Sequence, residues 1–218
     1  MELRSNQPVE RFKAVHVVAE LNITISIPDE RFLELLNSNQ PFSTLLLPPG
    51  VNLYQAADLV SQGKPIHIVE TGCLRDTHPS AWITDGWSTF YFAKWIKAHP
   101  ESKFTSIELA PEAIAKCKTF LQSHDLVDYV QFVNGSSAEE ILDLSDTADL
   151  FFLDAGDGLE AGLVDFKAAL THNPKLIIMD DFGKKVALAA EYASNKNIPY
   201  VRIDRYTVFT TGPITFPS

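Results

Sequence analysis

Residues 150–158 read Leu150-Phe151-Phe152-Leu153-Asp154-Ala155-Gly156-Asp157-Gly158. Four consecutive apolar residues followed by an acidic turn are typical of a strand that is buried on both faces. The same pattern recurs in residues 176–181, where Asp180 and Asp181 follow an apolar run. Two such strands predict a parallel sheet that carries acidic side chains along one edge.

Further strands and helices are expected to alternate on either side of this stretch. The strands are expected at residues 66–69, 103–107, 129–133, 150–153, 176–179, 200–203 and 207–209, and the helices at 87–98, 111–123, 136–144, 159–170 and 185–194. The last two strands are joined by a short turn, which requires antiparallel pairing. The fold class is therefore α/β, a doubly wound seven-stranded sheet that is mostly parallel with an antiparallel C-terminal strand.

The N-terminal part has a different pattern. Apolar and polar residues alternate over 21–27, which predicts a half-buried strand, and a short helix is expected from residue 28. Pro48-Pro49-Gly50 predicts a break, followed by a helix near residues 53–60. We interpret residues 1–63 as an N-terminal cap on a main domain of residues 64–218. Covering core surface is its expected role, with a substrate lid or a dimer contact as alternatives.

Length and charge limit the classes of partner. A chain of 218 residues is long enough for one domain with a sizeable core. Its formal charge of −10 disfavours nucleic acid and anionic membranes as partners. Cys73 and Cys117 form no C-x-x-C pair, and no apolar run has the length of a membrane span. We expect a cytoplasmic protein with a small-molecule substrate, and the sequence allows a homo-oligomer.

Ligands of doubly wound sheets bind at the carboxyl ends of the strands, so the residues that follow each strand are the candidates. Glu70 and Gly72 follow the first strand without a complete G-x-G-x-x-G motif. After a long loop, Gly86 and Ser88 are placed to supply a close backbone approach and helix-start donors. An ordinary turn and helix cap explain these residues equally well. Glu108 follows the second strand, where a carboxylate can accept hydrogen bonds from both ribose hydroxyls.

Two serines follow the third strand. Ser136 and Ser137 stand at a helix start, where they are expected either to meet an adenine edge or only to cap the helix. Ser136 and Glu139 have the spacing of a capping box.

Three carboxylates follow the fourth and fifth strands. Asp154, Asp180 and Asp181 would repel one another if neighbouring strands bring them together, unless a cation lies between them. Oxygen ligands suit Mg²⁺, so we expect a magnesium site. The alternative is that these residues cap helices and bind backbone amides without a metal.

These segments resemble the class I S-adenosylmethionine-dependent methyltransferases over roughly residues 66–212, through Glu70-Thr71-Gly72, Ser106-Ile107-Glu108 and the two acidic strand ends. That resemblance implies a Rossmann-like fold and S-adenosyl-L-methionine as cofactor. The acidic strand ends are similar to those of metal-dependent small-molecule O-methyltransferases, related to catechol and macrocin O-methyltransferases. The resemblance to these families implies that Glu70, Gly72, Glu108 and Asp154 bind the cofactor. It also implies that Asp154, Asp180 and Asp181 hold the metal.

The expected reaction is magnesium-assisted O-methylation of a small hydroxylated metabolite. The lysine that acts as base in the catechol enzyme would fall near Asp157, which is not a lysine, so Asp154 or Asp157 is the expected base. The alternatives are a metal-independent methyltransferase, and a Rossmann-like domain that binds S-adenosylmethionine or a nucleotide without catalysis. A nicotinamide-dependent oxidoreductase is disfavoured because the G-x-G-x-x-G motif is incomplete.

Overall fold

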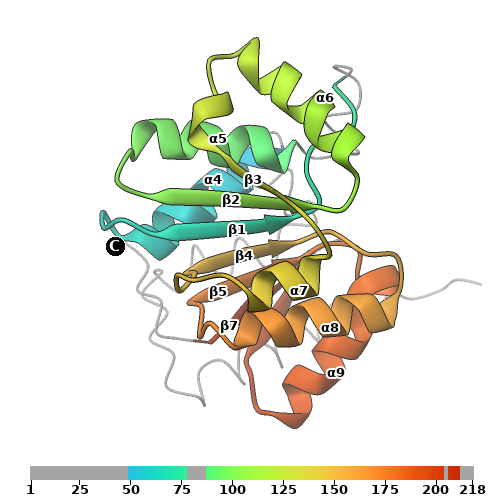
Figure 1. Ribbon diagram of the computed structural model, residues 1–218. Helices are drawn as coiled ribbons and strands as arrows, with labels where there is room; N and C mark the ends of the chain where they lie inside the picture. The colour runs from blue at the N-terminus through green and yellow to red at the C-terminus, as the bar shows by residue number, and fades with distance from the viewer. Residues whose placement is uncertain (1–48, 78–86, 204–205, 212–218) are drawn as a thin grey trace, which may run out of the picture.

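The structure, a computed structural model, describes residues 49–77, 87–203 and 206–211 (Figure 1). A single seven-stranded sheet lies at its centre, with the order β3-β2-β1-β4-β5-β7-β6. The strands are β1 His67–Thr71, β2 Lys103–Glu108, β3 Gln131–Asn134, β4 Leu150–Leu153, β5 Leu176–Met179, β6 Tyr200–Ile203 and β7 Tyr206–Thr210. Strands β1 to β5 pair in parallel, and β7 runs antiparallel to both β5 and β6. The predicted sheet is confirmed.

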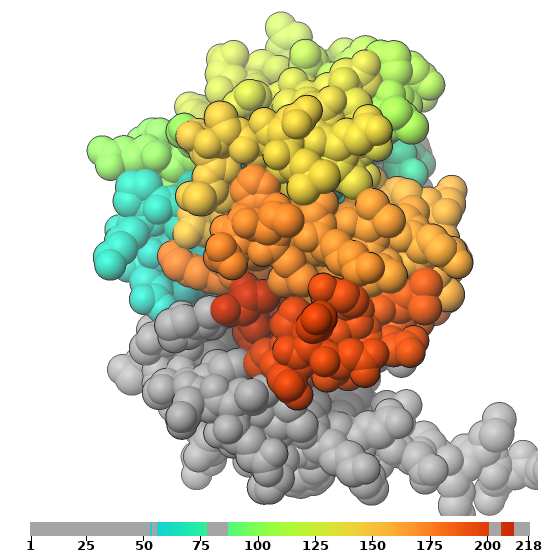
Figure 2. Space-filling view, turned by 60° about the horizontal axis from the view of Figure 1, so that its bottom comes forward, coloured from blue at the N-terminus to red at the C-terminus, as the bar shows by residue number. Residues whose placement is uncertain are grey.

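Helices cover both faces of this sheet. They are α4 Pro49–Ser61, α5 Ser88–Ala98, α6 Pro111–Gln122, α7 Ser137–Leu142, α8 Leu159–Leu170 and α9 Ala187–Asn195. Alternate side chains of the central strands enter opposite layers: Phe152 packs with α4 and α5, whereas Phe151 and Leu153 pack with α8 and α9. Helices α7, α8 and α9 lie side by side over their face, as Figure 2 shows in yellow, orange and red. The result is a three-layer α/β/α fold.

Helix α4 belongs to the segment expected to form a cap. It begins at Pro49, because proline is tolerated in the first turn of a helix. Leu53, Ala57 and Val60 are buried in the core cluster that contains Ile68 of β1. The indole Nε1 of Trp95 in α5 donates a hydrogen bond to Asp58 Oδ1 of α4 at 2.7 Å. This part of the expected cap is therefore packed into the helical layer. The strand expected at 21–27 and the helix from 28 lie outside the described residues, and the boundary at residue 63 stays a prediction.

Two local elements differ from the expectation. A 3₁₀ turn, η2 Val127–Tyr129, precedes β3, so this strand begins later than predicted. The helix expected at 185–194 is preceded by a π-helical turn, η3 Phe182–Val186. Asp181 starts η3 in a left-handed conformation with φ of 57°, and its carbonyl accepts both the Lys184 and Lys185 N–H groups at 2.9 Å. This compact turn places Lys185 close to the end of β5.

The chain order locates the switch point of the sheet. From β1 the chain moves outward through β2 and β3, and then returns to β4 on the other side of β1. The crevice at such a reversal is the usual ligand site of an open α/β sheet. Among the described helices, none is long and apolar enough to cross a membrane.

Candidate active site

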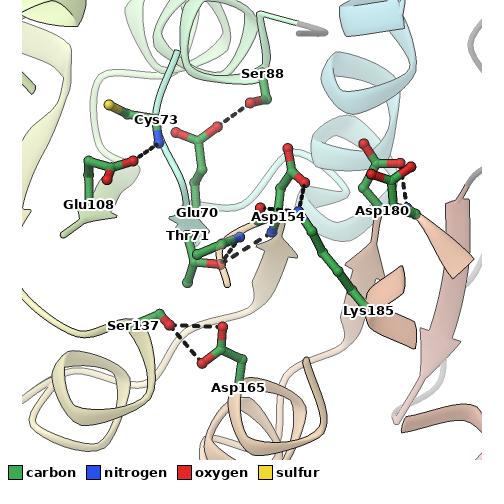
Figure 3. A network of polar contacts seen from close by, with 12 residues as sticks. Glu70, Thr71, Cys73, Ser88, Glu108, Ser137, Asp154, Asp165, Asp180 and Lys185 are labelled. Atoms are coloured by element: carbon green, nitrogen blue, oxygen red, sulfur yellow. Dashed lines mark hydrogen bonds and ion pairs between the residues drawn. The ribbon is translucent and has the colours of Figure 1, made fainter. Parts of the chain in front are cut away.

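Glu70, near the end of β1, is fully buried beneath the start of α5. Thr89 Oγ1 and Ser106 Oγ donate hydrogen bonds to its Oε2 at 2.7 and 2.8 Å, and Ser88 Oγ donates to its Oε1 (Figure 3). Burial raises the pKa of Glu70 to about 7, with a smaller contribution from the charge of Asp154, although the hydroxyl donors oppose the shift. Glu70 and Ser88 therefore fix α5 to the sheet, and direct cofactor contacts by either side chain stay predictions.

Gly72 allows two turns to approach each other at the switch point. Its φ is +84°, and a Cβ atom there would lie 3.3 Å from both the backbone N of Ala155 and the carbonyl carbon of Asp154. Thr71 Oγ1 accepts hydrogen bonds from the N–H groups of Asp154 and Ala155, each at 3.2 Å. Because a side chain would separate these turns, glycine is suited to this position.

Glu108, at the end of β2, lies beside the same turn. Its Oε2 accepts a hydrogen bond from Cys73 N at 3.2 Å, and its Oε1 accepts one from Ala110 N at 2.9 Å. Each carboxylate oxygen can accept a further hydrogen bond, and the residue is only partly buried, so a ligand can reach it. Leu109, which follows it, is 71% exposed. An exposed apolar side chain next to a strand-end carboxylate suits the base and the ribose of an adenosyl group. Leu109 could not be expected as a site residue from the sequence, because a single leucine after a strand forms no recognisable pattern.

Asp154, at the end of β4, forms an ion pair with Lys185 (Figure 3). Lys185 Nζ donates to Asp154 Oδ1 at 2.6 Å and to its backbone O at 2.5 Å. Lys185 is 7% exposed, so its charge is shielded from water by the protein. This partner was not anticipated, because a lysine at the start of a helix is ordinarily a surface residue.

The two aspartates after β5, Asp180 and Asp181, form hydrogen bonds with backbone N–H groups. Asp180 is 2% exposed, and its Oδ1 accepts a hydrogen bond from the backbone N of Asp181 at 2.7 Å. Asp181 itself supports η3 through its carbonyl. Across residues 49–77, 87–203 and 206–211, no group of three or more His, Cys, Asp or Glu side chains is arranged to hold a metal ion. In this arrangement Asp154 Oδ1 pairs with Lys185 and Asp180 Oδ1 accepts a backbone N–H, so the magnesium role of Asp154, Asp180 and Asp181 stays a prediction.

The serines after β3 support the helical layer. Ser136 is the N-cap residue of α7, but its side chain makes no capping hydrogen bond, so the capping-box contact expected with Glu139 is not formed. Ser137 Oγ donates to both carboxylate oxygens of Asp165, at 2.7 and 2.8 Å. Burial raises the pKa of Asp165 to about 6, against the Ser137 hydrogen bond and the Lys185 charge. An adenine contact by Ser136 or Ser137 stays a prediction.

The remaining candidates lie outside this network. Asp157 is exposed on the turn after β4. Gly86 lies outside the described residues. A hollow of about 280 Å³ is lined by residues that include Leu170, Asn173 and Thr211. It lies beside the amino end of β5, away from the carboxyl ends that carry Glu108 and Asp154. We assign it no role in the reaction.

The fold is that of the class I S-adenosylmethionine-dependent methyltransferases, and comparisons with known proteins point to the same fold. A family model described as "Methyltransferase domain" matches residues 83–182. No curated protein gives a significant match.

Solved structures share the fold at low sequence identity. A methyltransferase from Podospora anserina, PaMTH1, bound to S-adenosylhomocysteine, is 16% identical with a TM-score of 0.58, covering 97% of this chain and 99% of the other. Cofactor-bound Rv0187 from MTB is 15% identical with a TM-score of 0.54, covering 97% and 100%. The O-methyltransferase TomG from Streptomyces achromogenes, involved in tomaymycin synthesis and in complex with S-adenosylmethionine, is 15% identical with a TM-score of 0.53, covering 93% and 89%.

Proposed function

We propose that this chain transfers a methyl group from S-adenosylmethionine to a hydroxyl oxygen of a small metabolite. The observation that carries this proposal is the convergence of three strand ends at the switch point. The turn at Gly72 packs against the turn at Asp154. Glu108 accepts a hydrogen bond from the backbone N–H of Cys73, which follows Gly72. In a methyltransferase fold this is the edge at which the cofactor is expected.

The cofactor is held from both sides of Gly72 in this proposal. Glu108 accepts hydrogen bonds from the ribose hydroxyls, and Leu109 provides an apolar contact for the adenine. The backbone beside Gly72 approaches the amino-acid part of the cofactor, with the start of α5 on its far side, whereas Gly86, also expected to contact the cofactor, lies outside the described residues. Ser136 and Ser137 form the outer wall of the adenine site.

Methyl transfer is an in-line displacement that needs orientation and one proton acceptor. A lone pair on the acceptor oxygen attacks the methyl carbon, and the electrons of the carbon–sulfur bond return to sulfur, which leaves neutral S-adenosylhomocysteine. Asp157 takes the hydroxyl proton, because it is exposed on the turn beside Asp154, whereas Asp154 Oδ1 is held by Lys185. No step is assigned to magnesium, because the described carboxylates do not form a site for it.

An oxygen acceptor of small size is favoured by two observations. TomG, an O-methyltransferase, has the same fold, and its complex contains the same cofactor. The charge of −10 disfavours nucleic acid and anionic membranes as acceptors. A cytoplasmic location belongs to the same proposal.

Transfer from methyl-labelled S-adenosylmethionine to a panel of catechols, simple phenols and sugar diols tests this function. We expect a labelled methyl ether from at least one of these acceptors. Asp157→Asn should lower kcat by about 100-fold, because a positioned base contributes 10²–10⁴-fold, while cofactor affinity stays unchanged. Asp143→Asn, at an exposed position after α7, is the matched control and should keep full activity.

Cofactor binding without transfer to any acceptor would contradict methyltransferase activity on this class of substrate. It would favour the alternative of a domain that binds the cofactor without catalysis.

A further inference from the structure

Lys185 is a buried cation that the proposed reaction does not use. Its side chain is 9% exposed, and the Asp154 side chain that it contacts is 20% exposed. Two of the three ammonium N–H groups reach the same residue, one to the carboxylate and one to the backbone carbonyl. A lysine is rarely buried to this extent unless it is paired. The burial of the Asp154–Lys185 ion pair at the end of β4 therefore indicates a specific role for the lysine.

The ammonium lies against one of the two carboxylate oxygens that a metal ion on Asp154 would use. A divalent ion on Asp154 requires the lone pairs of its carboxylate, and Lys185 Nζ lies 2.6 Å from Oδ1. Any metal would have to displace this ammonium or accept a positive charge beside it in a site of low dielectric. Magnesium also sheds its water reluctantly and needs near-octahedral oxygen ligands.

We propose that Lys185 is the built-in cation of this site: its ammonium takes the place of a divalent metal on Asp154 and positions that residue, so that methyl transfer needs no divalent metal. The inference rests on the proposed function. The positioning extends to the cofactor turn, because Asp154 N is also bound by Thr71 Oγ1 and the Asp154 carbonyl group packs on Gly72. Lys185 is thus a positioning residue that acts through Asp154.

Binding of Mn²⁺, used as a paramagnetic probe for Mg²⁺, tests the occupancy of Asp154. The loss of the free Mn²⁺ signal in electron paramagnetic resonance gives a dissociation constant for the full chain, with and without S-adenosylmethionine. We expect the wild type and Asp154→Asn to agree within threefold, because Asp154 is not available to the metal. Weakening of more than threefold in Asp154→Asn would overturn the proposal.

Variants of Lys185 test the cause. Lys185→Met removes the charge and keeps most of the length, so Asp154 becomes available and Mn²⁺ should bind at least tenfold more tightly than to the wild type. Lys185→Arg keeps the positive charge and should show no gain. The double variant Lys185→Met/Asp154→Asn should lose the gain in Mn²⁺ affinity. Because it has no unpaired buried carboxylate, it also serves as the folded comparison if Lys185→Met folds poorly. Absence of a gain in folded Lys185→Met, or an equal gain in the double variant, would overturn the proposal.

Calorimetry with S-adenosylmethionine separates this inference from the proposed function. A wild-type chain that binds no cofactor would remove the proposed function, whatever the Mn²⁺ titrations give. Cofactor binding together with Asp154-dependent Mn²⁺ binding would retain the proposed function and reject Lys185 as the resident cation.

Discussion

Glu70 shows how a single buried carboxylate links the stability of the domain to pH. The folded state favours the neutral form, since burial raises its pKa from 4.5 to about 7. The stability associated with this group is fully present below pH 4.5 and is lost as the pH rises through about 7. At neutral pH the protein therefore holds a carboxylate whose ionised form is supported only by the hydroxyls around it.

Glu70→Gln should remove this dependence, because the amide does not titrate. Between pH 4.5 and 8, the free energy of unfolding of the wild type should fall by about 3 kcal/mol relative to Glu70→Gln. Urea unfolding of both proteins across this range measures the difference. Glu101→Gln, at an exposed position before β2, should show no such trend relative to the wild type. A difference between wild type and Glu70→Gln that stays constant with pH would contradict the assignment.

At the residue scale, the sequence predicts where the site residues lie along the chain better than it predicts which residues they contact. Glu108 and Asp154 follow their strands as expected, since apolar strands that end in acidic residues leave a clear pattern. The contacts of Ser88, Ser137 and Lys185 are made with residues 18 to 31 positions away, and no local pattern contains them. For this reason the ion pair between Asp154 and Lys185 could not be predicted from the sequence.

Packing between α8 and η3 is the contact between elements that sets the position of Lys185. Gly162, within α8, faces the backbone of η3 so closely that an added Cβ would lie 2.0 Å from the carbonyl oxygen of Lys185. Neither segment can relieve such a contact by a side-chain rotation, because the oxygen belongs to the backbone. A glycine inside a helix is therefore required here for packing, despite its low helix propensity.

Gly162→Ala should destabilise the protein by about 2 kcal/mol, because overpacking outweighs the ordinary gain of alanine in a helix. Thermal unfolding should show a decrease of about 4–8 °C for a domain of this size. Gly183→Ala, in η3 itself, is the matched control, because nothing lies within 4 Å of its added Cβ. It should leave the midpoint nearly unchanged. A Gly162→Ala protein as stable as Gly183→Ala would show that α8 and η3 do not pack this closely.

The elements themselves followed largely from periodicity and composition. Strands such as β4 and β5 are four-residue apolar runs, and helices α5, α6 and α8 start within one residue of the expected positions. The π-helical turn η3 could not be predicted, because its conformation depends on Asp181 adopting a positive φ and on contact with α8. Helix α4 begins at Pro49, earlier than expected, because proline is tolerated in the first turn and the helix is buried against α5.

At the scale of the whole molecule, the sheet order brings together residues that are far apart in the sequence. Gly72, Glu108 and Asp154 come from three different strands, and they meet because β1 lies between β2 and β4. Helices cover both faces of the sheet and leave the carboxyl ends of β1, β2 and β4 together at one edge (Figure 1). This arrangement, rather than any single motif, is the basis of the cofactor site that we propose at the switch point.

Isothermal titration calorimetry of S-adenosylmethionine with the wild type and Glu108→Ala tests this claim most directly. We expect one site per chain in the wild type and an affinity at least tenfold weaker in Glu108→Ala, because hydrogen bonds to a charged group contribute about 1.5–3 kcal/mol. Glu112→Ala, exposed in the first turn of α6, should bind as the wild type does. No binding heat in the wild type, or equal affinity in Glu108→Ala, would contradict a cofactor site at the ends of β1, β2 and β4.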